Sequence, residues 1–300
     1  MIHILFSFLF IGMELSYAAD SFDELAKQCG NSKDFHEKIQ FCTQALTSWG
    51  IEDGYVNKGE VYLERALAYM VIGKLEPALA DADNAVNIIP HSWQTHNARG
   101  EILAKLNRCK EALSEYNEAF QGIHPTDHVN RSYLLYKRGV MWRDCAKSYE
   151  EAIKNFEAAI VESSKIKDTE SVAWAAMGRG VTKCKQKQYA EGLKNIAHAI
   201  EILSNLHFHY EMGICQQAKG NLVAAAKSYS EVIRRTKPKR PHETYVSKEF
   251  GTTTVGVSTE EELIDSYYRR AQVNEKMRKH KLASKDYLKA CQMGLNQACK

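Results

Sequence analysis

The sequence predicts an all-α superhelical solenoid of about seven helix pairs, and two observations support this fold class. Alanine-rich amphipathic segments recur along the chain, as in Gly220–Ile233, where alanines occupy a face that large apolar residues normally fill. Only five prolines occur in 300 residues, which leaves room for long helices. Because protein interiors are close-packed, alanines on a buried face indicate that another helix lies directly against it.

The overall composition is typical of a soluble, folded protein and not of a disordered one. Hydrophobic residues make up 44% and charged residues 26% of the chain. The formal net charge of +3 is too small to indicate the clustered basic face of a nucleic-acid-binding protein. We therefore expect no nucleic-acid partner.

Residues 1–18 are expected to be a signal peptide. The run MIHILFSFLFIGM is apolar but too short to span a membrane comfortably, and Ser16 and Ala18 form a small-x-small cleavage pattern. Only His3, and no lysine or arginine, precedes the apolar stretch. The alternative is a buried or anchoring helix. The signal-peptide interpretation predicts an exported protein, periplasmic or secreted, with no stable membrane span after cleavage.

Six segments repeat the order small, large or apolar, small along one helix face. They are Ala78/Ala82/Ala85, Ala112/Tyr116/Ala119, Ala152/Phe156/Ala159, Gly192/Ile196/Ala199, Ala225/Tyr229/Val232 and Ala283/Tyr287/Ala290. An upstream helix carries one small residue about a dozen positions earlier. These residues are Ala66, Gly100, Gly139, Gly180, Gly213 and Ala271. Small residues on both helices let the two backbones pack as an antiparallel hairpin.

This repeating pattern resembles the tetratricopeptide repeat (TPR) family. The copy that spans Gly59–His91 has the family's signature residues at Tyr62, Ala66, Tyr69, Gly73, Ala78, Ala85 and Pro90. Copies starting near 59, 93, 132, 173 and 206 make up a solenoid over 59–235, after a degenerate first repeat over 19–58. A last repeat, over 263–300, is TPR-like or Sel1-like. The resemblance implies a right-handed superhelix of helix pairs with a concave binding face.

Residues 236–262 interrupt the repeats. Pro238, Pro241, Gly251, Gly256 and a run of threonines cannot continue a helix, so this segment is expected to be an insertion loop. The segments TYVSKEF and TTVGVS are candidates for a short β-hairpin around Gly251.

All eight cysteines follow the expected cleavage site, and their even number suits an oxidising compartment. Cys29 and Cys42 lie in a segment that resembles the opening of exported bacterial TPR proteins, which carry such a pair. Cys291 and Cys299 resemble the cysteines of Sel1-like repeats, which bridge consecutive helices; Gly294 offers the turn that a bridge requires. By repeat position, Cys109 would pair with Cys145 and Cys184 with Cys215. The alternative for these four is a free buried thiol.

The sequence contains no recognisable catalytic or metal-binding motif. It lacks G-x-S-x-G, a phosphate loop, H-E-x-x-H and paired C-x-x-C spacing, so we expect no enzyme activity, no cofactor and no zinc. A Sel1-like enzyme whose site the sequence does not show is the alternative.

In the TPR family, repeat positions 2, 5, 9 and 12 line the concave groove. In the three central repeats these positions predict a mainly aromatic and apolar groove, with Lys137, Arg143 and Lys185 at its edges. The predicted groove residues are Tyr133, Tyr136, Val140, Trp174, Met177, Val181, Tyr210 and Ile214. The alternative for each is that it packs between neighbouring repeats and does not contact a ligand. The family's carboxylate clamp is absent, since Leu63 and Leu67 stand at its positions. We expect a non-catalytic scaffold that binds a protein or an extended peptide; self-association through the same surface is the alternative.

Overall fold

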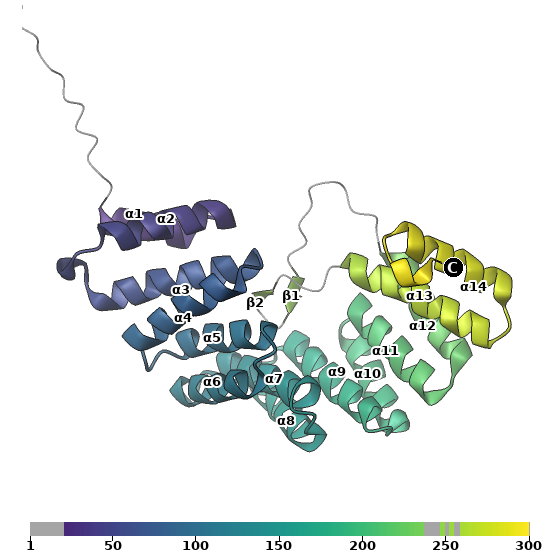
Figure 1. Ribbon diagram of the computed structural model, residues 1–300. Helices are drawn as coiled ribbons and strands as arrows, with labels where there is room; N and C mark the ends of the chain where they lie inside the picture. Colours follow the sequence, from purple (N-terminus) through teal and green to yellow (C-terminus); the bar gives the residue numbers. More distant parts are fainter. Residues whose placement is uncertain (1–20, 237–246, 250–251, 255–258, 300) are drawn as a thin grey trace, which may run out of the picture.

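The chain folds into an arc of packed helix pairs (Figure 1). A computed structural model describes residues 21–236, 247–249, 252–254 and 259–299, and these contain fourteen α-helices in seven consecutive pairs. The prediction of an all-α solenoid of about seven pairs is confirmed. The expected signal peptide, residues 1–18, lies outside the described residues.

The first helices of the pairs are α1 (Phe22–Asn31), α3 (Tyr55–Val71), α5 (Trp93–Lys105), α7 (His128–Asp144), α9 (Thr169–Lys185), α11 (Leu206–Lys219) and α13 (Thr259–Lys276). The second helices are α2 (Phe35–Ser48), α4 (Leu75–Ile88), α6 (Cys109–Gly122), α8 (Tyr149–Lys165), α10 (Tyr189–Ile202), α12 (Leu222–Arg235) and α14 (His280–Gln292). Short 3₁₀ turns lie at Ile51–Asp53 and Asn296–Ala298.

The small residues of the repeat are buried between the two helices of each pair. Ala78, Ala82 and Ala85 of α4 are fully buried. At Gly139 of α7, an added Cβ would come within 2.8 Å of the Phe156 ring on α8. Such an approach is sterically forbidden, so this glycine is what allows α7 and α8 to pack around a large aromatic side chain. The alanine-rich helices are therefore one half of a closely packed pair, as the sequence predicts.

From the second pair to the seventh, the turn between the two helices has one residue in a left-handed conformation, two positions before the second helix begins. This residue is Gly73, Asn107, Lys147, Lys187, Gly220 or Arg278, according to the pair. Positive φ is readily adopted by glycine and is costly for lysine or arginine. The turn geometry is thus kept even where the residue does not favour it.

An arginine stands immediately before the small residue of the first helix in five pairs. In four of these pairs it contacts a polar side chain sixteen residues later on the second helix. The pairs are Arg65–Asp81, Arg99–Glu115, Arg179–Asn195 and Arg270–Asp286. Arg65 and Arg270 each donate two hydrogen bonds to their carboxylate, at 2.7–2.8 Å. These contacts orient the two helices of a pair in addition to their apolar packing.

The segment between α12 and α13 contains a short antiparallel hairpin, β1 (Ser247–Glu249) and β2 (Thr252–Thr254), in which Lys248 is opposite Thr253. Of the expected insertion 236–262, residues 237–246, 250–251 and 255–258 lie outside the described residues. Its last four residues, 259–262, are not a loop but the first turn of α13. Within the part of the chain that the structure describes, none of the helices is both long and apolar enough to cross a bilayer.

Candidate functional site

The first helices of the pairs form the inner face of the arc. Consecutive first helices pack against one another, as α7 does with α9 and α9 with α11. Consecutive second helices of the described chain are further apart. A row of helix pairs that is tighter on one side curves toward that side, so the inner, concave face is built from α1, α3, α5, α7, α9, α11 and α13.

The aromatic residues predicted to line the groove are brought together, but they are buried. Tyr133, Tyr136, Trp174 and Met177 are at most 6% exposed. The Trp174 ring lies 6.5 Å from the Tyr136 ring and 4.8 Å from the Phe208 ring, both edge-on. These side chains fill the space between neighbouring pairs, because an inward-facing residue of one first helix is covered by the next. At these four positions the side chains therefore lie beneath the concave face and do not form its accessible lining.

The other predicted groove residues lie nearer the surface. Val140, Tyr210 and Ile214 are partly exposed, whereas Val181 is 6% exposed and contributes to the wall of a hollow. Tyr210 donates a hydrogen bond to Asp265 of α13 at 2.5 Å. Burial, together with this hydrogen bond, raises the pKa of Tyr210 above its usual value, so its hydroxyl stays protonated.

Polar contacts connect successive first helices along the concave face. Glu101 of α5 accepts a hydrogen bond from Tyr133 of α7 and lies 3.4 Å from the ammonium of Lys137. Further along, His207 of α11 stacks on Trp174 and contacts Glu262 of α13 at 2.6 Å. The angle between neighbouring pairs is therefore set by hydrogen bonds as well as by ring packing.

A central hollow of about 360 Å³ opens between α7, α9, α11 and α13. Its lining combines three basic and two acidic side chains with aliphatic ones and a disulfide. The residues are Arg143, Asp144, Val181, Cys184, Lys185, Glu211, Ile214, Cys215, Ala218 and Arg269. Of the expected groove and edge residues, this hollow contains Val181, Ile214, Arg143 and Lys185.

The charges of the central hollow are partly paired. Arg143 binds both carboxylate oxygens of Asp144, at 2.5 and 2.9 Å, and the Lys185 ammonium lies 3.6 Å from the same group. Burial alone would raise the pKa of Asp144, but these cations outweigh it and hold the pKa below its usual value. The carboxylate therefore stays ionised and fixes the Arg143 side chain at the wall of the hollow.

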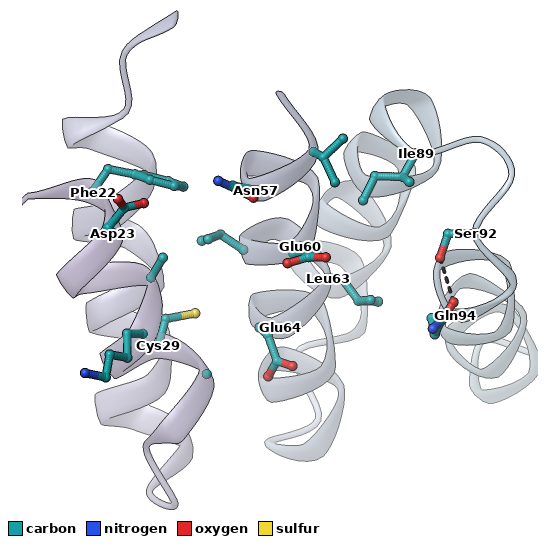
Figure 2. A pocket seen from close by; sticks show the side chains of 15 residues that line it. Phe22, Asp23, Cys29, Asn57, Glu60, Leu63, Glu64, Ile89, Ser92 and Gln94 are labelled. Carbon is teal, nitrogen blue, oxygen red and sulfur yellow. Dashed lines mark hydrogen bonds between the residues drawn. The ribbon is translucent and has the colours of Figure 1, made fainter. Parts of the chain in front are cut away.

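A second, N-terminal hollow of about 550 Å³ lies between α1, α3 and the connection from α4 to α5 (Figure 2). Figure 2 shows Glu60 and Leu63 on α3, between the helix that carries Phe22 and the segment that carries Ile89. Its lining combines apolar residues with three acidic, one basic and three uncharged polar side chains. The residues are Phe22, Asp23, Ala26, Lys27, Cys29, Gly30, Val56, Asn57, Glu60, Val61, Leu63, Glu64, Ile89, Ser92 and Gln94.

All eight cysteines lie at disulfide-bonding distance in the four expected pairs. Cys29–Cys42 joins α1 to α2, and Cys109–Cys145 joins the start of α6 to the end of α7. Cys184–Cys215 crosses from α9 to α11 within the central hollow, and Cys291–Cys299 closes the end of the chain. The Cα–Cα distances are 4.8, 5.7, 5.7 and 5.0 Å in this order, within the usual range for a disulfide. Among the described residues, no group of three histidine, cysteine or acidic side chains is arranged to hold a metal ion.

Comparison with solved structures identifies the fold. A tetratricopeptide repeat protein of Parabacteroides merdae is similar with a TM-score of 0.68 and 17% identity, over 92% of this chain and 94% of that one. The chain has the tetratricopeptide repeat fold. A signal-transduction ATPase of Pyrococcus horikoshii with a TPR sensor gives a TM-score of 0.66 at 17% identity, over 93% of this chain and 42% of that one.

A third similar structure is a Rap protein complexed with competence and sporulation factor. Its TM-score is 0.56 at 13% identity, over 93% of this chain and 73% of that one. No family model and no curated protein matches the sequence. At these identities the likeness establishes the TPR fold, and the chemistry of the site has to be argued from the chain's own residues.

Proposed function

We propose that this protein is a non-catalytic TPR scaffold that holds an extended segment of a partner protein against its concave face. The observation that carries the proposal is the central hollow, to which four successive first helices contribute. A hollow that crosses several parallel helices suits a linear segment, which can contact each helix in turn. The structurally similar Rap protein is complexed with a factor, so this fold is compatible with such a role.

The proposed contacts in the central hollow are mixed in character. Val181 and Ile214 offer apolar surface, and the guanidinium and ammonium groups of Arg143, Lys185 and Arg269 surround it. The buried Tyr136 and Trp174 hold α7 and α9 in place below this surface. A rigid wall lowers the entropy cost of binding, because little of it has to become ordered when the partner arrives.

We also propose that the protein is exported, as a mature chain that begins after Ala18. The four cysteine pairs at bonding distance support an oxidising compartment, because structural disulfides form and persist there. In this proposal, the repeats over 59–235 carry most of the binding face, 19–58 and the TPR-like or Sel1-like segment 263–300 close the two ends, and Arg269 of the last segment also lines the central hollow.

The proposal is tested by filling the central hollow. Ala218 lines it and is exposed, so Ala218→Trp places a large ring in the binding surface without disturbing the core. Ala190→Trp is the matched control, because Ala190 is an exposed alanine on the second helix α10. In crosslinking pull-downs from the native envelope or medium, Ala218→Trp should lose the partners that the wild type and Ala190→Trp retain.

Equal recovery of the same partners by both folded variants would contradict the proposal. Light scattering over a range of protein concentrations examines the alternative of self-association. A mass that rises with concentration, and that Ala218→Trp restores to that of the monomer, would assign the concave face to a second copy of this chain.

A further inference from the structure

The N-terminal hollow, of about 550 Å³, is larger than the central hollow, of about 360 Å³, and its floor is apolar (Figure 2). Phe22 and Val61 are 2% and 4% exposed and form its base, and Leu63 and Ile89 extend the apolar wall. An apolar concavity of this size gains free energy when an aliphatic chain replaces the water in it.

The rim of this hollow carries an excess of negative charge. Asp23, Glu60 and Glu64 are acidic, and Lys27 is the one basic residue among the lining side chains. Glu64 is already bound at 2.6 Å by Lys38, which also donates to the Gly30 carbonyl at 3.0 Å. Because Lys38 neutralises Glu64, the negative charge of the rim comes from Asp23 and Glu60, which outweigh Lys27.

Two of these carboxylates keep their full capacity to accept hydrogen bonds. Asp23 and Glu60 are exposed, and neither carboxylate has a hydrogen bond or an ion pair with another described residue. An anionic ligand would be repelled at this rim. A purely apolar ligand would cover the two carboxylates without replacing the hydrogen bonds that water donates to them. A ligand that carries both a cation and an aliphatic stem satisfies the floor and the rim together.

We infer that the N-terminal hollow binds a lysine or arginine side chain of the partner segment. The aliphatic stem lies on Phe22, Val61 and Leu63, and the charged head donates hydrogen bonds to Asp23 and Glu60. The inference rests on the proposed function in one respect: the cation belongs to a polypeptide that lies along the same concave face. The two hollows then differ in the charge that they favour in the partner. The N-terminal hollow favours a cation, whereas the central hollow is lined by more basic than acidic groups.

The test uses three blocked pentapeptides in which leucine alternates with lysine, glutamine or glutamate. They are titrated into the isotope-labelled full chain while the backbone amide resonances are recorded. The lysine peptide should shift amides of α1 and α3 around Phe22–Gly30 and Val56–Glu64, whereas the glutamate peptide should leave them unchanged. Shifts of these amides that are equal for the lysine and glutamate peptides would overturn the inference.

Charge variants of the full chain then locate the contact. Glu60→Gln should weaken binding of the lysine peptide about ten-fold, the scale of one hydrogen bond to a charged group. Glu118→Gln is the matched control, because Glu118 is exposed on α6 and has no described partner. Lys27→Ala should strengthen binding about two-fold by removing the one repulsive charge. Equal affinity in Glu60→Gln and Glu118→Gln, with both variants folded, would overturn the inference.

Other outcomes separate this inference from the proposed function. Shifts of the same amides that grow with protein concentration in the absence of peptide would assign the hollow to a second copy of the chain and overturn the inference. If Ala218→Trp abolishes partner capture but the lysine peptide causes no shifts, only the inference fails. If the lysine peptide binds at α1 and α3 but Ala218→Trp keeps every partner, the inference stands and the use of the central hollow is wrong.

Discussion

His209 of α11 is a single side chain whose proton affinity reflects the packing between two helices. It is partly buried, and its Nε2 lies 3.5 Å from the guanidinium of Arg235 on α12. Burial and the arginine lower the pKa of His209, and the nearby Glu231 opposes this only in part. The folded protein therefore favours the neutral imidazole more than the unfolded chain does.

This shift predicts how acid destabilises the protein. Above the usual histidine pKa of about 6.5, both states hold neutral His209, and its contribution to stability is fully present. As pH falls below that value, the unfolded chain gains a proton that the folded state resists, so stability is lost until the folded pKa is reached. Acidification from pH 7.5 to 5.5 should lower the urea midpoint of the wild type more than that of His209→Gln. An equal or larger fall in the variant would contradict this cause.

The burial of individual groove residues could not be predicted from the sequence. Repeat positions identified inward-facing side chains such as Tyr133 and Trp174, but their burial depends on the neighbouring pair, which a single copy of the repeat does not reveal. The same positional rule applied to the copy from Gly59 would have found Glu60 and Leu63 of the N-terminal hollow. Glu60 and Leu63 were not predicted as groove residues because they are acidic and aliphatic, whereas the predicted groove residues of the central repeats are mainly aromatic and apolar.

At the scale of helices and turns, the repeat keeps its geometry even where local preference opposes it. Helix pairing was predictable, since small residues on both helices let the two backbones approach closely: an added Cβ at Gly180 of α9 would lie 2.9 Å from the carbonyl oxygen of Gly192 on α10. The left-handed turn residue was harder to predict. Glycine marks it at Gly73 and Gly220, whereas Lys187 occupies the equivalent position with φ of 65°.

Lys187 is therefore expected to be a residue whose replacement stabilises the protein. It is exposed, and glycine adopts this conformation without the steric cost borne by a side chain, so Lys187→Gly should raise the free energy of unfolding by about 1 kcal/mol. Lys194→Gly is the control with the opposite sign. Lys194 is exposed inside helix α10, where glycine costs about 1 kcal/mol. A lower urea midpoint for Lys187→Gly would show that the turn is not under conformational strain.

At the scale of the whole molecule, the disulfides link parts of a structure that is nearly one-dimensional. In a solenoid each pair contacts only its neighbours, so unfolding can begin at an end and stop between pairs. Cys184–Cys215 joins α9 directly to α11 and crosses the boundary between two pairs, whereas Cys291–Cys299 closes only the C-terminal segment. The two bonds should therefore differ in how far their stabilisation extends.

Removing the central bond with Cys184→Ala and Cys215→Ala should expose this difference. The sequence separation of 31 corresponds to about 4 kcal/mol in the chain-entropy model, against about 2.5 kcal/mol for the separation of 8 at Cys291–Cys299. Without the central bond, the pairs that begin with α11 lose a covalent link to α9. Hydrogen exchange should then accelerate together across α11, α12, α13 and α14, whereas Cys291→Ala with Cys299→Ala should accelerate it only in α13 and α14. Uniformly faster hydrogen exchange over all fourteen described helices in both variants would contradict this prediction. Openings confined to one end cannot produce uniform exchange, so the solenoid would then unfold as one cooperative unit.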